Sequence, residues 1–201
     1  CPKSNHDGLN SIPSKIICSG LAYYNQLVQW GIPRNSLVIG GAFRFAKINS
    51  GKYNPNGPVF VAASADTEIT NILMRAVFGA QGGDRKFLIK IHPLYPKKII
   101  ETENIKITEQ TIPEQKGISA VVYGTGASGL EGLLAGIPTF RIRPNHKVAI
   151  NVLPEGIDAI PFSEMELSLK LDLALTPKKM VWETIYSPVD LDVWRQQLME
   201  N

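Results

Sequence analysis

Short apolar runs alternate with amphipathic stretches along most of this chain, and no other feature limits its fold as strongly. Two runs near the start, at 15–19 and 36–40, flank a helical pattern that ends near Trp30. Five more runs follow, at 58–64, 86–93, 104–108, 118–123 and 137–142. Strands that are connected through helices pair in parallel. We therefore expect an α/β fold, a doubly wound parallel sheet with flanking helices.

The helical patterns differ in strength. Residues 68–81 repeat apolar side chains every three or four positions, which places Ile69, Leu73 and Val77 on one helical face. Toward the end of the chain, three further stretches predict successive helices, at 163–175, 177–186 and 188–200.

A stretch dense in Gly, Asn and Pro, at 49–58, predicts a long loop between two blocks. It divides the sequence into a first block at 1–48, a loop at 49–57 and a second block at 58–201. The chain has 201 residues and begins at Cys1 rather than at a methionine, so we expect a piece of a longer or processed protein.

The composition is that of an ordinary folded protein, with 44% hydrophobic and 19% charged residues. The net charge of +3 suits an anionic ligand but is too diffuse to indicate nucleic-acid binding. The two cysteines, Cys1 and Cys18, show neither a metal spacing nor a disulfide framework. Because no apolar run reaches the length of a membrane span, we expect a cytoplasmic location, with the inner face of the membrane left open.

Gly124, Gly126 and Gly129 match the G-x-G-x-x-G spacing of dinucleotide-binding turns. That fingerprint belongs after the first strand of its unit, before a long helix, and has an acidic residue about 20 positions on. Here it follows the fourth strand of its block, its helix is short, and the next strand carries Arg141 and Arg143. A dinucleotide is therefore not the favoured ligand, although an arginine leaves NADP open.

The same turn also has the chemistry of an anion site. Backbone N–H groups and the positive end of the helix dipole favour a phosphate, and glycines let it approach closely. Thr125 and Ser128 add hydroxyl donors, so we favour ligand binding for the turn from Gly124 through Ala127 to Ser128. The alternative is a capping box, in which Ser128 caps the helix and Glu131 reaches back to the cap N–H.

His92 ends an apolar run, and Pro93 fixes the direction in which the chain leaves it. A histidine at the carboxyl end of a parallel strand can donate to a phosphate or supply a proton to a leaving group. Lys90 lies two residues earlier on the same strand face and is a weaker candidate, since a strand-end lysine is usually solvated.

Ser64 and Asp66 follow the strand at 58–64 in the sequence SADTE. They contact a ligand, or Asp66 or Thr67 caps the next helix, and the sequence leaves both open. No metal-ligand cluster and no Ser-His-Asp arrangement is legible.

Together these motifs resemble the C-terminal, nucleotide-sugar-binding lobe of GT-B glycosyltransferases. The similarity is greatest to bacterial surface-polysaccharide enzymes of the sialyltransferase and Kdo-transferase groups. It covers roughly 15–142, so that the first block looks like the end of an N-terminal lobe and the interlobe linker.

This resemblance implies that His92-Pro93 and the turn from Thr125 to Ser128 hold the nucleotide phosphate, with Glu131 near the donor ribose. It implies no cofactor beyond a nucleotide-activated sugar donor of the CMP or UDP type, with CDP-linked donors also open. The acceptor would be a glycan or a lipid-linked acceptor.

The chain also departs from the family pattern. Most of the N-terminal lobe is absent, so we expect the missing lobe of the same enzyme to be a partner, and the acidic general base of that lobe has no candidate here. Two alternatives stay open: a nucleotide-sugar epimerase of similar fold, and a non-catalytic nucleotide-sugar-binding module.

Overall fold

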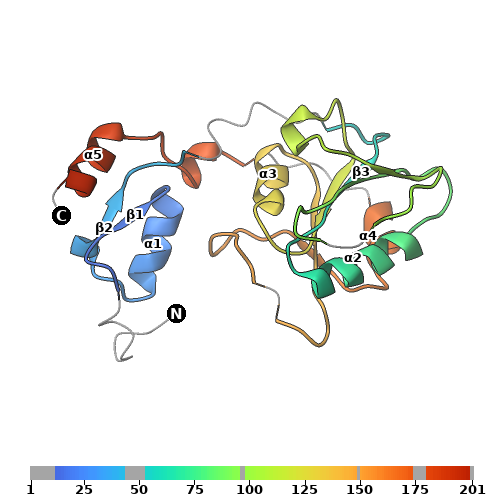
Figure 1. Ribbon diagram of the computed structural model, residues 1–201, viewed down its shortest axis with the longest axis horizontal. Coiled ribbons are helices and arrows are strands. Elements are labelled where there is room, and N and C mark those ends of the chain that lie inside the picture. Colours follow the sequence, from blue (N-terminus) through green and yellow to red (C-terminus); the bar gives the residue numbers. More distant parts are fainter. Residues whose placement is uncertain (1–11, 44–52, 96–97, 149, 174–179, 200–201) are drawn as a thin grey trace. The chain divides into compact units, whose positions relative to one another are not determined.

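The computed structural model describes residues 12–43, 53–95, 98–148, 150–173 and 180–199. The chain forms two compact units (Figure 1). The first unit comprises Cys1–Lys47, Pro154–Ile157 and Val181–Asn201, and the second comprises Ile48–Leu153 and Asp158–Met180. Residues 181–201 thus group with the first block of the sequence and not with the second.

The second unit is built on a six-stranded parallel sheet with the order β5-β4-β3-β6-β7-β8. Its strands are β3 (Val59–Ala62), β4 (Phe87–Lys90), β5 (Ile105–Ile107), β6 (Ala120–Tyr123), β7 (Thr139–Ile142) and β8 (Ile160–Phe162). The predicted α/β fold and its five predicted strands in this unit are confirmed, while β8 was not predicted.

Helices cover both faces of this sheet (Figure 1). The helices α2 (Thr67–Gly79) and α4 (Leu167–Asp172) pack on one face, and α3 (Ser128–Leu134) packs on the other. Apolar side chains between α2 and the sheet form the main core, including Val61, Ile69, Leu73, Val77, Ile89 and Phe140. Burial of this apolar surface is the main force that holds the layers together.

The strand order places a switch point between β3 and β6. The chain runs from β3 to β4 and β5 on one side, and then returns to add β6, β7 and β8 on the other. Ala62, the last residue of β3, pairs with Lys90 of β4 and Tyr123 of β6, so the carboxyl ends are level. In open α/β sheets, ligands bind outside these ends at the switch point.

The first unit contains a two-stranded parallel sheet of β1 (Ile16–Cys18) and β2 (Leu37–Ile39), joined through α1 (Leu21–Gln29) and a 3-10 turn, η2 (Arg34–Ser36). These elements confirm the prediction for the first block. The helix α5 (Leu191–Met199), also predicted, is anchored by Trp194, whose indole Nε1 donates to the Gly40 carbonyl at 2.8 Å.

Three predictions about the connections need correction or lie outside the described residues. The helix predicted at 177–186 is wrong over its described part, where only a 3-10 turn, η4 (Trp182–Thr184), is present. The helix predicted at 163–175 is shorter, since α4 begins at Leu167. The predicted loop at 49–57 is described only from Tyr53, which forms a β-bridge with Ile118.

Over the part of the chain that the structure describes, no helix is both long enough and apolar enough to cross a membrane.

Candidate functional site

The turns that follow β3 and β6 adjoin at the switch point. A Cβ atom placed on Gly124 would lie 2.5 Å from Cγ2 of Ile69 and 3.8 Å from Oγ of Ser64. The start of the β6 turn is therefore packed directly against the start of α2. Because contacts below 3.0 Å are not tolerated, this position needs a glycine for close approach.

The other two glycines of the motif have different roles. Gly126 has a φ of +106°, and a Cβ there would meet no atom within 4 Å, so this residue sets the backbone turn and leaves open space. A Cβ on Gly129 would lie 2.1 Å from Cζ of Tyr123, because α3 lies close against the sheet. The motif thus combines a close approach, a left-handed turn and helix–sheet packing.

The side chain beneath α3 is that of Tyr123, which is only 1% exposed. Burial raises the pKa of its phenol to about 12, and among the described residues the hydroxyl has no hydrogen-bond partner. The sequence indicated Tyr123 only as the end of an apolar run, and not as the residue that requires Gly129.

The capping box expected at the start of α3 is absent. The N-cap is Ala127, no side chain caps the helix, and Ser128 is already its first residue. Glu131 lies half-buried in the first turn. A capping box does occur elsewhere, where the Glu114 carboxylate accepts from Thr111 at the start of η3 (Ile112–Glu114).

The hydroxyls of the β6 turn are available to a ligand. Thr125 and Ser128 are both partly exposed, and within the described ranges neither hydroxyl has a hydrogen-bond partner. The first N–H that closes a helical bond in α3 is that of Glu131, to the Ala127 carbonyl at 3.0 Å. The N–H groups of the earlier residues of α3 therefore have no acceptor within the helix, as at any helix start.

Ser64 has a structural role in the β3 turn, in contrast to the predicted ligand contact. It is 3% exposed, its N–H donates to Oγ1 of Thr70 at 3.0 Å, and its carbonyl accepts from the same hydroxyl. Its own Oγ lies 3.3 Å from both the Asp66 carbonyl and Oγ1 of Thr70. The pair of Ser64 and Thr70 fixes the path of the chain from β3 into α2.

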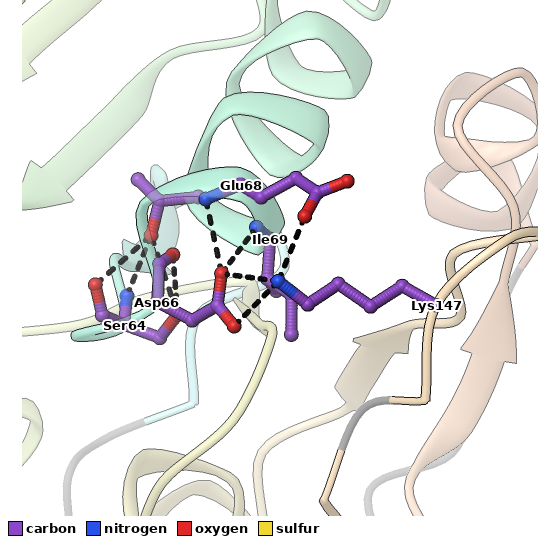
Figure 2. Close-up of polar contacts among 6 residues, drawn as sticks. Ser64, Asp66, Glu68, Ile69 and Lys147 are labelled. Atoms are coloured by element: carbon purple, nitrogen blue, oxygen red, sulfur yellow. Dashed lines mark hydrogen bonds and ion pairs between the residues drawn. The ribbon is translucent and has the colours of Figure 1, made fainter.

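Asp66 is the N-cap of α2, which is one of the two roles that the sequence left open. Its Oδ1 accepts from the amides of Glu68 at 3.0 Å and Ile69 at 3.1 Å. Figure 2 shows that Lys147, from the segment after β7, reaches the same carboxylate, with its Nζ 2.8 Å from Oδ2 of Asp66 and 2.8 Å from Oε2 of Glu68. The Asp66 carboxylate is thus engaged by two amides of α2 and by Lys147.

These contacts shift the titration of both partners. The hydrogen bond from Lys147, followed by that from the Ile69 amide, lowers the pKa of Asp66 below its ordinary value. The carboxylates of Asp66 and Glu68 in turn raise the pKa of Lys147. Each charge favours the ionised form of the other.

The Asp66 contacts predict a pH dependence of stability. A carboxyl whose pKa is lowered by folding contributes stability above its unfolded pKa, near 4, and loses it as the pH falls through the folded pKa. Asp66→Ala should lower the free energy of unfolding at pH 7 by about 1 kcal/mol, because the helix loses its cap. Asp66→Asn keeps a good cap and removes the charge, so at pH 7 it should lower the free energy of unfolding by less than Asp66→Ala does. In a plot of the urea-unfolding midpoint against pH, the fall at acid pH should be less steep for Asp66→Asn than for the wild type. An acid limb as steep as in the wild type would contradict the assignment.

His92 lies two residues after the carboxyl end of β4 and is partly exposed. Its Nδ1 accepts from the Leu94 amide at 3.2 Å, and its carbonyl accepts from the amide of the buried Tyr95 at 2.8 Å. A neutral imidazole that accepts at Nδ1 carries its proton on Nε2. His92 is therefore arranged as an Nε2 donor, and Pro93 beside it is exposed.

Lys90 is not brought to the switch point. Its Nζ donates to the Glu109 carbonyl at 2.6 Å, and Glu109 follows β5, which lies on the far side of β4 from β3. The Lys90 ammonium therefore stabilises the segment that follows β5.

Of the predicted residues, the structure brings Gly124, at the start of the β6 turn, close to Ser64. His92 lies one strand farther out, with β3 between β4 and β6. Neighbouring strands are spaced by about 4.8 Å, so the backbones of β4 and β6 are roughly 10 Å apart. A ligand that contacts both His92 and the turn must extend across the end of β3.

Comparison with known proteins adds no family assignment. No family model matches this sequence, and no curated protein is significantly similar to it. Function must therefore be argued from the site.

Two further features concern possible ligands. Among the described residues, no group of three or more His, Cys, Asp or Glu side chains is placed to hold a metal ion. A cavity of about 730 Å³ lies at the opposite, amino edge of the sheet, lined by residues that include Val59, Ala120 and Phe140. We place the site at the carboxyl edge, because only there do polar turns meet at a switch point.

Proposed function

We propose that this chain is the nucleotide-sugar-binding part of a glycosyltransferase, which transfers a sugar from a nucleotide-activated donor to a bacterial cell-surface polysaccharide. The observation that carries the proposal is the β6 turn. It lies at the switch point, it has open space at Gly126, and its two hydroxyls, on Thr125 and Ser128, are unengaged among the described residues. These are the features that a phosphate site requires.

The turn supplies uncharged donors, and the Glu131 carboxylate lies in the first turn of the helix that follows. The Thr125 and Ser128 hydroxyls and the first amides of α3 would donate to phosphate oxygens. As the glycosidic bond breaks, negative charge builds on the departing nucleotide, and donors that are already oriented stabilise that charge. His92 would donate a hydrogen bond from Nε2 to the same leaving group from across β3 and so stabilise its charge. To act as a general acid it would have to be the imidazolium, in which Nδ1 no longer accepts from the Leu94 amide.

The β3 turn argues against a dinucleotide. In dinucleotide-binding units, the pyrophosphate lies on the helix that follows the first strand. Here that helix is α2, and its N-cap is Asp66, which accepts the first amides itself. The Asp66 carboxylate already accepts from the amides at the start of α2, where a phosphate would otherwise bind. We therefore assign the phosphate to the β6 turn and not to the start of α2.

The first unit supports the expectation that this chain belongs to a two-lobed enzyme. Its described sheet has only two parallel strands, and no residue of α1 is fully buried. Parallel sheets are normally covered on both faces and contain more strands. We propose that a further part of an N-terminal lobe completes this sheet and supplies the acceptor site and the general base.

The proposal predicts nucleotide binding at the β6 turn. Calorimetric titration of the chain with CMP, UDP, CDP and NADP should show binding of one of the pyrimidine nucleotides, with NMR shift changes between Gly124 and Gly129. Replacing both hydroxyl residues, Thr125→Ala with Ser128→Ala, should weaken binding at least about tenfold, since two hydrogen bonds to a charged group are lost. Ser14→Ala, an exposed serine of the first unit, is the matched control.

Two outcomes would indicate a different function. Preferential binding of NADP with shifts in the same turn would restore the dinucleotide interpretation. Release of an epimerised or free sugar by the full enzyme without an acceptor would indicate a nucleotide-sugar epimerase instead.

A further inference from the structure

A second polar cavity lies at the carboxyl edge on the α2 face of the sheet. Its volume is about 390 Å³, and it is formed by the first half of α2, the segment 143–147 after β7 and Glu164 after β8. We call it the rim pocket. None of the residues assigned to donor binding lines it, so a ligand of the rim pocket is independent of the proposed function.

Two ion pairs fix the walls of the rim pocket. The Arg75 guanidinium donates to both carboxylate oxygens of Glu164, at 2.6 and 3.0 Å. Lys147 is held by the carboxylates of Asp66 and Glu68. Bidentate pairing restricts Arg75 and Glu164, which compensate each other, and Lys147 is held between two carboxylates.

Two basic side chains on the same pocket are not compensated. Arg143 and His146 both line it and are both exposed, and within the described part of the chain neither side chain has a hydrogen-bond or ion-pair partner. The backbone beneath Arg143 is anchored, because its amide donates to the Phe162 carbonyl of β8 at 2.8 Å. A guanidinium on an anchored backbone is suited to bidentate recognition of an oxyanion, and the imidazole of His146 lines the same pocket.

We propose that the rim pocket is a binding site for a single oxyanion, a carboxylate or a phosphate group, which Arg143 binds with His146 as a second donor. The nearby carboxylates of Glu68 and Glu164 limit the ligand to one anionic group on a small polar body. Glu164 is paired with Arg75, whereas Glu68 shares Lys147 with Asp66, so one carboxylate charge is left in excess. This excess disfavours a polyanion without excluding a single acidic group.

The test is titration of the full chain with inorganic phosphate and, separately, with acetate, followed by NMR of the amides at 143 and 145–147. We expect saturable shifts with a Kd of about 1 mM or tighter for at least one of the two anions. Tighter binding of phosphate would identify a phosphate group as the natural ligand, and tighter binding of acetate a carboxylate. Sodium chloride at matched ionic strength controls for screening.

Arg143→Gln should weaken this binding at least about tenfold, and Arg143→Lys, which keeps the charge without the planar fork, should fall in between. Arg34→Gln, an exposed arginine of the first unit, should leave it unchanged. Because the Arg143 side chain has no described partner, its loss should leave the shifts of α3 and β6 unaltered. Absence of saturation with both anions, equal shifts with chloride, or undiminished binding in Arg143→Gln would overturn the proposal. Phosphate binding at 124–129 is read from separate amides, so failure at one site is distinguishable from failure at the other.

Discussion

His92→Ala is expected to lower turnover of the full enzyme about 100-fold while leaving its urea-unfolding midpoint nearly unchanged. Removal of one oriented donor to a developing charge costs about 3 kcal/mol of transition-state stabilisation, which corresponds to a factor of about 10² or more in rate. The structural contribution of the imidazole is small by comparison. Its described hydrogen bond is the one from the Leu94 amide to Nδ1, worth about 1 kcal/mol, and the side chain is partly exposed.

A second substitution distinguishes the two chemical roles of His92. Glutamine can place an amide N–H close to the position of Nε2 but cannot transfer a proton. If His92 stabilises charge only by donating a hydrogen bond, His92→Gln should recover part of the lost rate. If His92 acts as a general acid, glutamine should be as slow as alanine. Nucleotide release from the donor is the measurement, and equal losses of stability and activity would make His92 a structural residue.

The parallel sheet could be predicted from the sequence because each strand is a short apolar run between helical patterns. The missed strand, β8, shows the limit of that signal. Its sequence is Ile160-Pro161-Phe162, and a proline normally argues against a strand. Pro161 is tolerated because β8 is at the edge of the sheet, which no local pattern reveals.

The wrong helix at 177–186 has a tertiary cause. Over its described part the chain is held in the first unit by close backbone packing. A Cβ on Gly20 would lie 2.1 Å from the Ile185 carbonyl oxygen, and the Ser187 amide donates to the Ser19 carbonyl at 3.0 Å. These contacts with residues far away in sequence outweigh the local helical pattern.

The local contacts of the candidate site residues could be predicted only in part. The S/T-x-x-E spacing occurs at Thr111–Glu114, Ser128–Glu131 and Ser163–Glu166. Thr111–Glu114 forms a capping box and Ser128–Glu131 does not. The partner of Asp66 could not be found locally, because Lys147 lies 81 residues away in the sequence. Sequence spacing identifies candidate local pairs of side chains. Which of them form, and which distant partners join them, depends on how the tertiary fold brings the segments after β3 and β7 together.

Gly129→Ala should be among the most destabilising single-methyl additions in the second unit. The new Cβ would lie 2.1 Å from Cζ, 2.5 Å from the hydroxyl oxygen and 2.6 Å from Cε1 of Tyr123. The ring cannot withdraw easily, because Tyr123 is 1% exposed and packed in the interior. Overpacking of this kind costs about 1–3 kcal/mol, which exceeds the gain of up to about 1 kcal/mol from replacing a helical glycine by alanine.

A double-mutant cycle isolates the contact between Gly129 and the ring. In a Tyr123→Leu background the clashing atoms are absent, so adding Gly129→Ala should be neutral or stabilising by urea unfolding. Gly126→Ala is the matched control, since a methyl there meets no atom and only the φ of +106° opposes it, so its cost should be the same in both backgrounds. Because α3 carries Ser128, a displaced helix should also weaken nucleotide binding in Gly129→Ala, and the double variant should recover it. An equal cost of Gly129→Ala with and without the ring would mean that α3 does not depend on Tyr123 for its position, and the packing role of the third glycine would be lost.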